Sequence, residues 1–189
     1  LLKELDLIDD IKFVHPKDMQ DGTILISGTD ITTNLPYVDG VHLCFDHHLS
    51  ETVRVGKRKS HIIDPNAPSA ARVVYEYYGG ENAFPKIFSE MMDAVDKADS
   101  ARYSEREILA PSDWALLNFI IDPRTGISRL DQFSFANDDF MRDMMVYCRH
   151  HPVEEILAIA EVEERLHVFQ KHEELAEMQI RRCATLDGN

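Results

Sequence analysis

The sequence predicts an α/β fold, in which a parallel sheet is covered by helices on both faces and is followed by more helices and a long linker helix. Three observations predict this class. In the first half, short apolar runs alternate with amphipathic segments, as in α/β proteins. Several of these runs are apolar on successive residues, which is typical of parallel strands that are buried on both faces. The second half contains only helical patterns, and the last of them is long.

The expected strands lie in the first half of the chain. Residues 1–10 carry leucines at helical spacing without a preceding cap, so we expect a helix that is already under way there. Strands are expected over residues 11–15, 23–29, 41–45 and 61–63. Helices are expected over 68–80 and 85–101, and Gly79 and Gly80 provide a stop signal for the first of these.

The second half reads as a helical region that ends in one extended helix. Helices are expected over 111–121 and 138–149, with a loop between them. Pro152 lies at the first turn of an apolar stripe that continues to Cys183, which predicts one helix over about 153–185. Such a helix would be roughly 50 Å long at 1.5 Å per residue. That length suits a linker between domains or a helix that pairs two copies into a homodimer.

The composition is that of a folded globular chain. Of the 189 residues, 44% are hydrophobic and 29% are charged. A chain of this length buries about 70% of its unfolded surface, so it needs neither a disulfide nor a structural metal to fold. The three cysteines, Cys44, Cys148 and Cys183, lack the spacing of a zinc site. Because no apolar run approaches about 18 residues and no basic segment of a signal peptide opens the chain, we expect a cytoplasmic protein.

The charge balance bears on the kind of partner. The chain has 20 basic and 34 acidic residues, which gives a formal net charge of −14. An acidic surface repels long nucleic acid and anionic membranes, so we expect neither as a partner. A small phosphate-containing substrate would need local neutralisation, and divalent metal ions are one way to provide it.

The strongest chemical signal is the run Asp46-His47-His48, directly after the strand expected over 41–45. Sheets of α/β proteins bind ligands at the carboxyl ends of their strands, and neutral imidazole is a common ligand of transition metals. Adjacent side chains of an extended backbone point to opposite sides. We therefore expect one ring to bind metal and the other to meet the substrate. The alternative is a pair of hydrogen-bonded histidines without a functional role.

Further carboxylates could converge with this run. Asp30 follows the strand expected over 23–29, so it would lie at the same edge of the sheet as Asp46. The helix expected over 85–101 carries three acids that recur every third residue, which are Asp93, Asp96 and Asp99. This spacing places them on one helical face. They either share a cation or form a solvated acidic face, and the spacing leaves both possibilities open.

These motifs resemble the DHH phosphoesterase superfamily, which includes RecJ-like exonucleases, nano-RNases, exopolyphosphatases and family II pyrophosphatases. The segments that carry the resemblance are TILISGTD, LCFDHHLS and HIIDPNAPSAARVVYEYYG. The resemblance covers about residues 11–129, and its most specific part is the Asp-His-His element between its upstream strand and its downstream Ser-Ala-Ala helix.

The resemblance implies roles for individual residues. The implied metal ligands are Asp30, Asp46, His47 and one of Asp96 and Asp99. Of the last two, Asp96 is favoured. Asp46 and His48 are the implied catalytic residues, with His48 in contact with the phosphate. Arg124 and Arg129, in the loop after residue 121, are candidates for substrate binding, although solvated arginines in an ordinary turn are the alternative.

The sequence departs from the family pattern at both ends. The family's first motif, a strand that ends in Asp-x-Asp, is absent, and so is the C-terminal substrate-binding domain that usually follows the linker helix. We therefore expect a DHH-type catalytic domain over 1–150, without its first strand and motif. Residues 151–189 would form a linker helix toward the absent domain. Either truncation or divergence would explain the departure, and in both cases we expect the chain alone to hydrolyse its substrate poorly.

The resemblance also implies a mechanism and a cofactor. Two divalent ions, manganese or else magnesium, would hold the phosphate and activate a bridging water. Carboxylate and imidazole ligands suit these ions. The expected activity is that of a metal-dependent phosphoesterase or phosphoanhydride hydrolase acting on polyphosphate or a small nucleotide, as in an exopolyphosphatase-related enzyme. The alternative is a non-catalytic DHH-like module that senses a nucleotide or assembles with partners.

Overall fold

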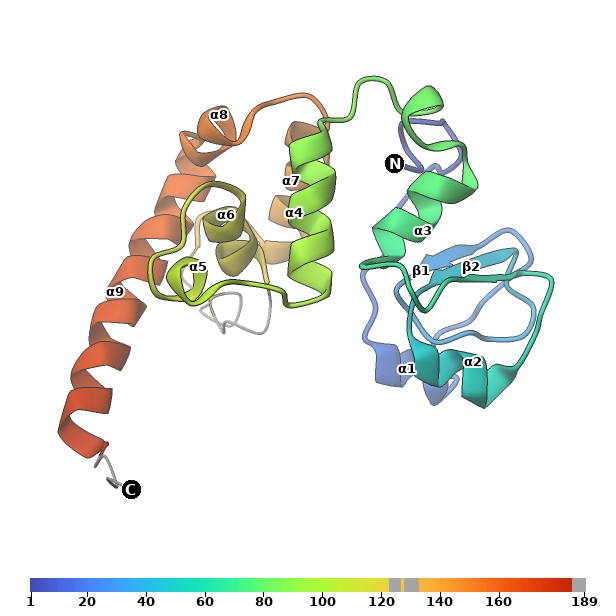
Figure 1. The fold of residues 1–189 in the computed structure, drawn as a ribbon, viewed down its shortest axis with the longest axis horizontal. Helices are drawn as coiled ribbons and strands as arrows, with labels where there is room; N and C mark the ends of the chain where they lie inside the picture. Colours follow the sequence, from blue (N-terminus) through green and yellow to red (C-terminus); the bar gives the residue numbers. More distant parts are fainter. Residues whose placement is uncertain (123–126, 128–132, 185–189) are drawn as a thin grey trace. The chain divides into compact units, whose positions relative to one another are not determined.

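The computed structural model describes residues 1–122, 127 and 133–184 of the chain. It divides into two compact units, Leu1–Ser104 and Glu105–Asn189, and each is described by itself (Figure 1). This division falls inside the catalytic domain expected over 1–150, so the compact units are not the expected domains, and that assignment stays a prediction. Among the described residues, no helix is both long and apolar enough to span a bilayer.

The first unit is built on a parallel three-stranded sheet, which confirms the α/β class. Its strands are β1 (Ile31–Thr33), β2 (Leu43–Asp46) and β3 (His61–Ile63), and they lie in that order with β2 in the centre. The register pairs Cys44 with Thr32 on one side and with His61 on the other. The predicted strands over 41–45 and 61–63 are therefore confirmed.

Both faces of the sheet are covered. Phe45 is fully buried and packs against Val73 and Val74 of α3 (Ala70–Tyr77). Cys44 faces the other way, into a cluster that includes Tyr37 and Val55, the last residue of α2 (Leu49–Val55). The helices expected over 68–80 and 85–101 form as α3 and as α4 (Ser89–Asp99). The unit also contains α1 (Pro16–Gln20) and the 3₁₀ helix η1 (Gly80–Asn82).

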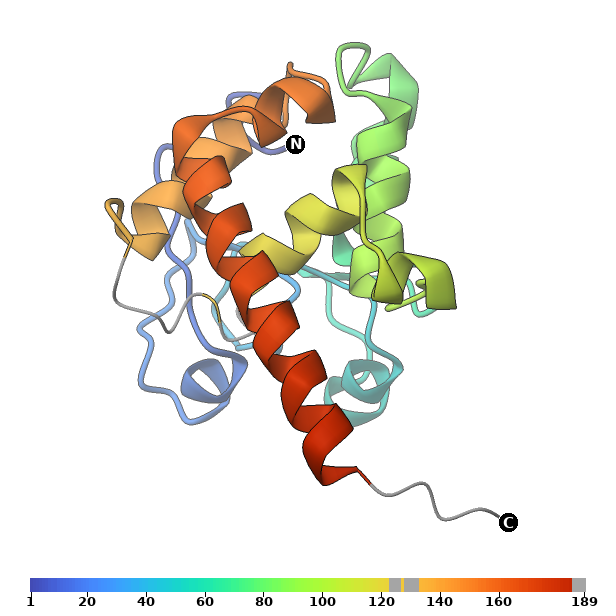
Figure 2. The same ribbon diagram turned by 90° about the vertical axis from the view of Figure 1, so that its left-hand side faces the viewer.

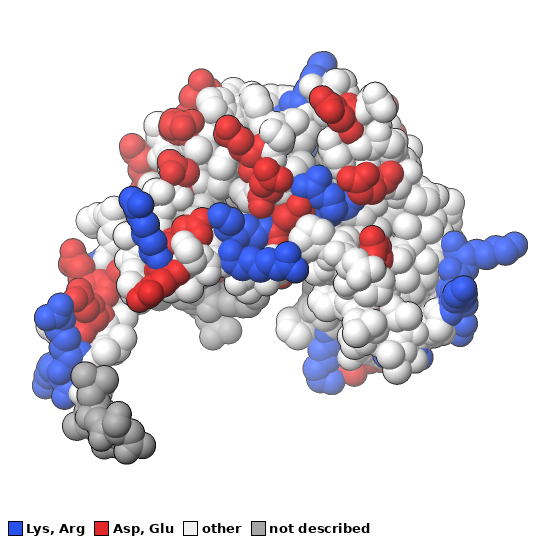
Figure 3. Space-filling model, viewed as in Figure 1, with Lys and Arg blue, Asp and Glu red and all other residues white. Residues whose placement is uncertain are grey.

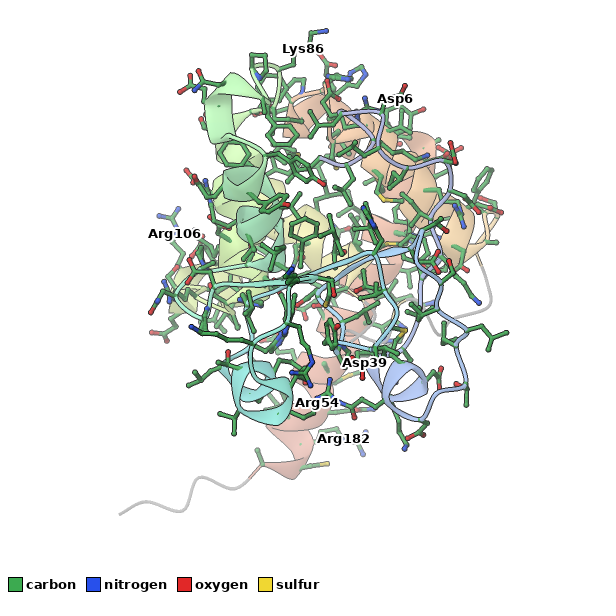
Figure 4. The ribbon with its side chains drawn as sticks, turned by 90° about the vertical axis from the view of Figure 1, so that its right-hand side faces the viewer. Asp6, Asp39, Arg54, Lys86, Arg106 and Arg182 are labelled. Carbon is green, nitrogen blue, oxygen red and sulfur yellow. The ribbon has the colours of Figure 1, made fainter. Side chains whose placement is uncertain are left out.

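Helix α2 is tied to the loop before β2 by an ion pair between the buried carboxylate of Glu51 and the exposed guanidinium of Arg54. The Glu51 carboxylate accepts a hydrogen bond from the backbone N–H of Tyr37 at 2.9 Å, and the Arg54 guanidinium donates to both oxygens of Glu51. Arg54, labelled in Figure 4, also donates to the carbonyl of Tyr37 at 2.8 Å. These contacts fix the start of α2, which directly follows the two histidines.

The N-terminal predictions are wrong in three places. Residues 1–10 form turns and not a helix, and residues 11–15 and 23–29 form no strand. The apolar run at 23–29 is not buried, since Leu25 is 94% exposed. The Asp30 carboxylate accepts hydrogen bonds from both the backbone N–H and the hydroxyl of Ser27, at 2.7 and 2.9 Å. This local turn competes with strand pairing, so the strand begins only at Ile31.

The second unit consists of helices around one apolar core. They are α5 (Glu105–Leu109), α6 (Asp113–Ile121), α7 (Asn137–Tyr147), α8 (Val153–Leu157) and α9 (Ala160–Cys183). The helices predicted over 111–121 and 138–149 are confirmed as α6 and α7. Figure 2 shows α9 extending beyond the other helices of this unit.

The single helix predicted over 153–185 is wrong, because it breaks between α8 and α9. Ile159 has an extended backbone, with φ of −74° and ψ of 136°. Ile156 and Val162 are both fully buried in the same core. On one continuous helix these residues, six positions apart, would be rotated by about 240° from each other. The break lets both side chains enter the core.

Candidate functional site

The Asp-His-His run lies at the carboxyl edge of the sheet, as predicted. Asp46 is the last residue of β2, and His48 occupies the N-cap position of α2 without a side-chain capping hydrogen bond. Asp46 is fully buried, and its Oδ1 accepts hydrogen bonds from the backbone N–H of His47 at 2.8 Å and of His48 at 3.3 Å. The carboxylate therefore folds back over the strand-to-helix turn and holds its geometry.

The ring of His48 is oriented by the same carboxylate. Its Nδ1 lies 2.7 Å from Asp46 Oδ1. An ionised carboxylate can only accept a hydrogen bond, so Nδ1 carries the proton in this contact. The other nitrogen, Nε2, is left for an external group, and 53% of the side chain is exposed. This arrangement suits contact with a substrate.

His47 presents its Nε2 to an acid from another helix. Its Nδ1 lies 3.2 Å from the carbonyl oxygen of Ala67, which can only accept, so this nitrogen is also protonated. The Nε2 is then a lone-pair donor. It lies 3.2 Å from Asp99 Oδ2 but forms no hydrogen bond there, although it is buried. A metal ligand that fixes its tautomer through a backbone carbonyl has this arrangement.

The two rings contact each other edge to face, with centroids 4.6 Å apart. Side chains that follow each other on an extended backbone point to opposite sides, but these two rings are in contact, and the chain turns into α2 directly after His48. The partners of the two rings differ, and the division of roles between them stays a prediction. His47 faces Asp99 and is nearly buried, whereas His48 is held by Asp46 and is half exposed.

The acids on α4 have different environments, which the spacing alone did not distinguish. Asp96 accepts hydrogen bonds from the hydroxyl of Ser69 at 2.6 Å and from Nε of Arg72 at 2.8 Å. Arg72 also reaches Asp93, at 3.4 Å. Burial works to lower the pKa of Arg72, but its hydrogen bonds to Asp96 and the nearby acids raise it above its usual value. Asp96 is thus neutralised by a permanent cation.

The hydrogen bonds that Asp99 accepts come from neutral groups. Its Oδ1 accepts from the Asn34 side-chain amide at 3.2 Å, and its Oδ2 accepts from the backbone N–H of Ala70 at 3.1 Å. The nearest ionisable partner is the His47 ring. The geometry therefore brings together His47 and Asp99, and not His47 and Asp96.

Asp30 lies at the opposite end of the strands from Asp46, the amino-terminal end. It precedes β1, and its carbonyl accepts from the backbone N–H of His42, just before β2. The expectation that Asp30 and Asp46 share an edge is wrong, because the strand that was expected to end at Asp30 instead begins after it. Asn34, with a left-handed φ of 56°, occupies the carboxyl end of β1. Sequence reasoning missed this residue, and its only signal was a polar side chain in a turn after a β-rich run.

A second buried imidazole lies beneath the site. His61 begins β3, and neither of its ring nitrogens has a hydrogen-bond partner. Its Nε2 is 3.9 Å from Asp46 Oδ2, which is also buried without a partner. Burial lowers the pKa of His61, which favours the neutral ring. This residue was not identified from the sequence.

Two possible ligands of a divalent cation come together here, which are His47 and Asp99. Among the described residues, no three His, Cys, Asp or Glu side chains lie close enough to form a ready-made metal site. The pair formed by His47 Nε2 and Asp99 Oδ2 nevertheless offers one nitrogen and one oxygen, both of which manganese accepts. Arg124 and Arg129, the predicted substrate-binding residues, lie outside the described residues.

Figure 3 shows how charged side chains are distributed on one face of each unit. On the face shown in Figure 3, basic side chains on each unit are scattered among acidic ones and do not form a continuous stripe. A long nucleic acid needs such a stripe to neutralise its phosphates. A small substrate does not.

Comparison with solved structures identifies a protein of high similarity. No protein-family model matches the chain, and no curated protein does. The solved structure is PggH, a pGpG-specific phosphodiesterase from Vibrio cholerae, with 50% sequence identity and a TM-score of 0.88. The match covers 98% of this chain but only 59% of PggH.

Proposed function

The chain belongs to the DHH phosphoesterase superfamily, and on this premise we propose that the protein is a divalent-metal-dependent phosphoesterase that hydrolyses a small linear dinucleotide. The observation that carries the proposal is the buried Nε2 of His47, which has no hydrogen bond and faces Asp99 beside the half-exposed ring of His48. The similarity to a pGpG-specific phosphodiesterase favours pGpG over polyphosphate as the substrate.

The ligands that we assign are His47 and Asp99. We choose Asp99 over Asp96 because Arg72 and Ser69 already occupy the oxygens of Asp96. A bound manganese or magnesium ion supplies a Lewis acid and lowers the pKa of its bound water. The family resemblance implies a second ion. We assign it no ligands, since Asp30 lies at the amino-terminal ends of the strands, away from Asp46.

The other two residues of the motif act on geometry and on the substrate. Asp46 is a positioning residue, because its Oδ1 holds the Nδ1–H of His48 and the backbone of the turn. The ring of His48 is half exposed and leaves its Nε2 to contact a phosphate oxygen, to which it donates a hydrogen bond when both ring nitrogens carry a proton. Arg72 is bound to Asp96 and Asp93. The phosphate charge would therefore be met chiefly by the metal, with Arg124 and Arg129 as proposed additional contacts.

Metal binding and hydrolysis test different parts of this proposal. Calorimetric titration of the full chain with Mn²⁺ should give measurable heat, and His47→Ala should abolish it. His42→Ala is the matched control, because His42 is an exposed histidine on the same segment of chain. Absence of heat with the wild type would contradict the metal site.

Hydrolysis should then be measured with pGpG and with polyphosphate, in Mn²⁺ and in Mg²⁺. We expect slow conversion of pGpG to GMP that depends on metal, and loss of about 100-fold or more in His47→Ala and His48→Ala, since each removes a group that touches metal or phosphate. Faster turnover of polyphosphate would favour the exopolyphosphatase alternative. Metal binding without turnover of either substrate would favour the nucleotide-sensing module. Fast turnover would contradict the expectation that this chain alone hydrolyses its substrate poorly.

A further inference from the structure

A pocket of about 510 Å³ opens in the first unit between the edge strand β3 and helix α3. Its walls are mainly apolar and include Ile62, Pro68 and Val73, while Asp64, Glu76 and Tyr77 line it with polar or aromatic groups. We propose that this pocket binds the guanine base of the nucleotide whose phosphate meets His48. The inference rests on the proposed function and assigns the substrate's base to a separate part of the same unit.

The pocket is joined to the phosphate site through the backbone. The N–H of Asp64 donates to the carbonyl of Asp46 at 3.2 Å. The ring of His47 donates to the carbonyl of Ala67, which lines the pocket. Two segments of the pocket wall are thus hydrogen-bonded to the Asp-His-His run. The base and phosphate of one nucleotide are joined by a single sugar, so its two ends require neighbouring sites of this kind.

Tyr77 offers a surface on which a base can stack. It lies in the last turn of α3 and is 49% exposed. Its ring is held by an edge-on contact with Phe45, with centroids 5.2 Å apart, and by another with Tyr78, at 4.9 Å. A fixed, partly exposed ring beside apolar walls suits an aromatic base, and stacking on such a ring strengthens binding by roughly 5- to 150-fold per base.

The charges of the pocket select a base and not a phosphate. Asp64 and Glu76 are exposed acids, and the one cation on the wall, Arg72, is bound to Asp96 and Asp93. Two carboxylates repel a phosphate but accept hydrogen bonds from a base. Guanine presents a ring N–H and an amino group side by side on one edge, whereas the same edge of adenine presents one donor and one acceptor. The acceptor-rich rim therefore fits guanine better.

Equilibrium binding of mononucleotides to the full chain tests the assignment. In calorimetry we expect GMP to bind more tightly than AMP by roughly 5- to 150-fold, the range of one good bidentate contact to a base. Tyr77→Ala should lower the affinity for GMP by a similar factor, whereas Tyr77→Phe should keep the affinity because it keeps the ring. Glu76→Gln should reduce the ratio of GMP to AMP affinity. Glu81→Gln, the same change on an exposed acid outside the pocket, should leave the ratio unchanged.

Titration of the same variants with Mn²⁺ separates this inference from the proposed function. The pocket variants should bind Mn²⁺ as the wild type does, because neither side chain is an assigned ligand. Equal affinity for GMP and AMP, or wild-type GMP binding by Tyr77→Ala, would overturn the inference even if Mn²⁺ binds. Selective GMP binding that depends on Tyr77, in a chain that binds no Mn²⁺, would sustain the pocket and refute the metal site. Thermal unfolding followed by circular dichroism shows whether Tyr77→Ala is folded, and Glu76→Gln tests the pocket independently of that result.

Discussion

Replacing each of two neighbouring aspartates on α4 by asparagine should have opposite effects. Asp99→Asn should weaken Mn²⁺ binding and leave stability nearly unchanged, whereas Asp96→Asn should lower stability and leave Mn²⁺ binding nearly unchanged. The two changes are chemically identical and lie three residues apart on one helix face. They differ only in the partners of the two carboxylates.

The sizes follow from those partners. The Asp96 carboxylate accepts hydrogen bonds from Nε of Arg72 and from the hydroxyl of Ser69. Hydrogen bonds to charged groups contribute about 1.5–3 kcal/mol. Asparagine can keep the bond from Ser69 but loses the ionic pairing, so we expect the free energy of unfolding to fall by about 1.5–3 kcal/mol. At position 99 the asparagine amide oxygen can still accept from Ala70, so the loss there should be under about 1 kcal/mol.

Metal affinity should change in the reverse order. Removal of a residue that only hydrogen-bonds to a metal ligand typically lowers metal affinity by about 10- to 100-fold. Loss of a direct ligand in Asp99→Asn should therefore lower the affinity for Mn²⁺ by at least that much. The assays are urea unfolding of metal-free protein and calorimetric titration with Mn²⁺. If Asp96→Asn abolished Mn²⁺ binding while Asp99→Asn retained it, the assignment of Asp99 would be refuted, and the preference for Asp96 drawn from the sequence would be correct.

Two further predictions concern groups whose pKa is shifted. Hydrogen bonds from Arg54 lower the pKa of Glu51, so this pair stabilises the fold above the usual carboxyl pKa and the stabilisation is lost as the pH falls. Arg54→Met should therefore lower the free energy of unfolding by only about 1 kcal/mol at pH 7, because solvent screens the exposed guanidinium, and by less at pH 4; an equal loss in urea titrations at both pH values would contradict this. Burial raises the pKa of Cys44 and of Cys148 to about 11, and because the thiolate is the reactive form, both should resist a disulfide reagent at pH 8. The exposed Cys183 should react first, so rapid loss of a thiol from Cys183→Ser would contradict the shielding of the buried Cys44 and the partly buried Cys148.

The parts of the fold that sequence predicted well are those set by strong local patterns. The runs that became β2 and β3 are bounded by turns, and α3 has a capping serine and a stop at Gly79, whose φ is 108°. β1 was placed too early because the turn made by Asp30 and Ser27 depends on a side chain that competes with the strand. An apolar run alone carries no information about that competition.

The ambiguity in the site has a similar physical origin. A spacing of three residues places Asp96 and Asp99 on one face of α4, so periodicity treats them as equivalent. They differ because Arg72, from α3, neutralises only Asp96. That contact joins positions 24 residues apart in the sequence. It depends on the packing of α3 against α4, which a single sequence does not specify.

The net charge of −14 and the two proposed subsites together predict how a ligand's phosphate affects binding. Without metal, the acids around His47 and along the pocket repel a phosphate, so guanosine should bind at least as tightly as GMP. With Mn²⁺ bound at His47 and Asp99, the local charge becomes more positive by two units, and the order should reverse in favour of GMP. Calorimetry of both ligands, with chelator and with Mn²⁺, measures this reversal. The opposite result would be that GMP binds more tightly than guanosine in chelator and that Mn²⁺ does not change the affinity for GMP. In that case cations of the protein hold the phosphate, and the metal is not what offsets the acidity of this chain.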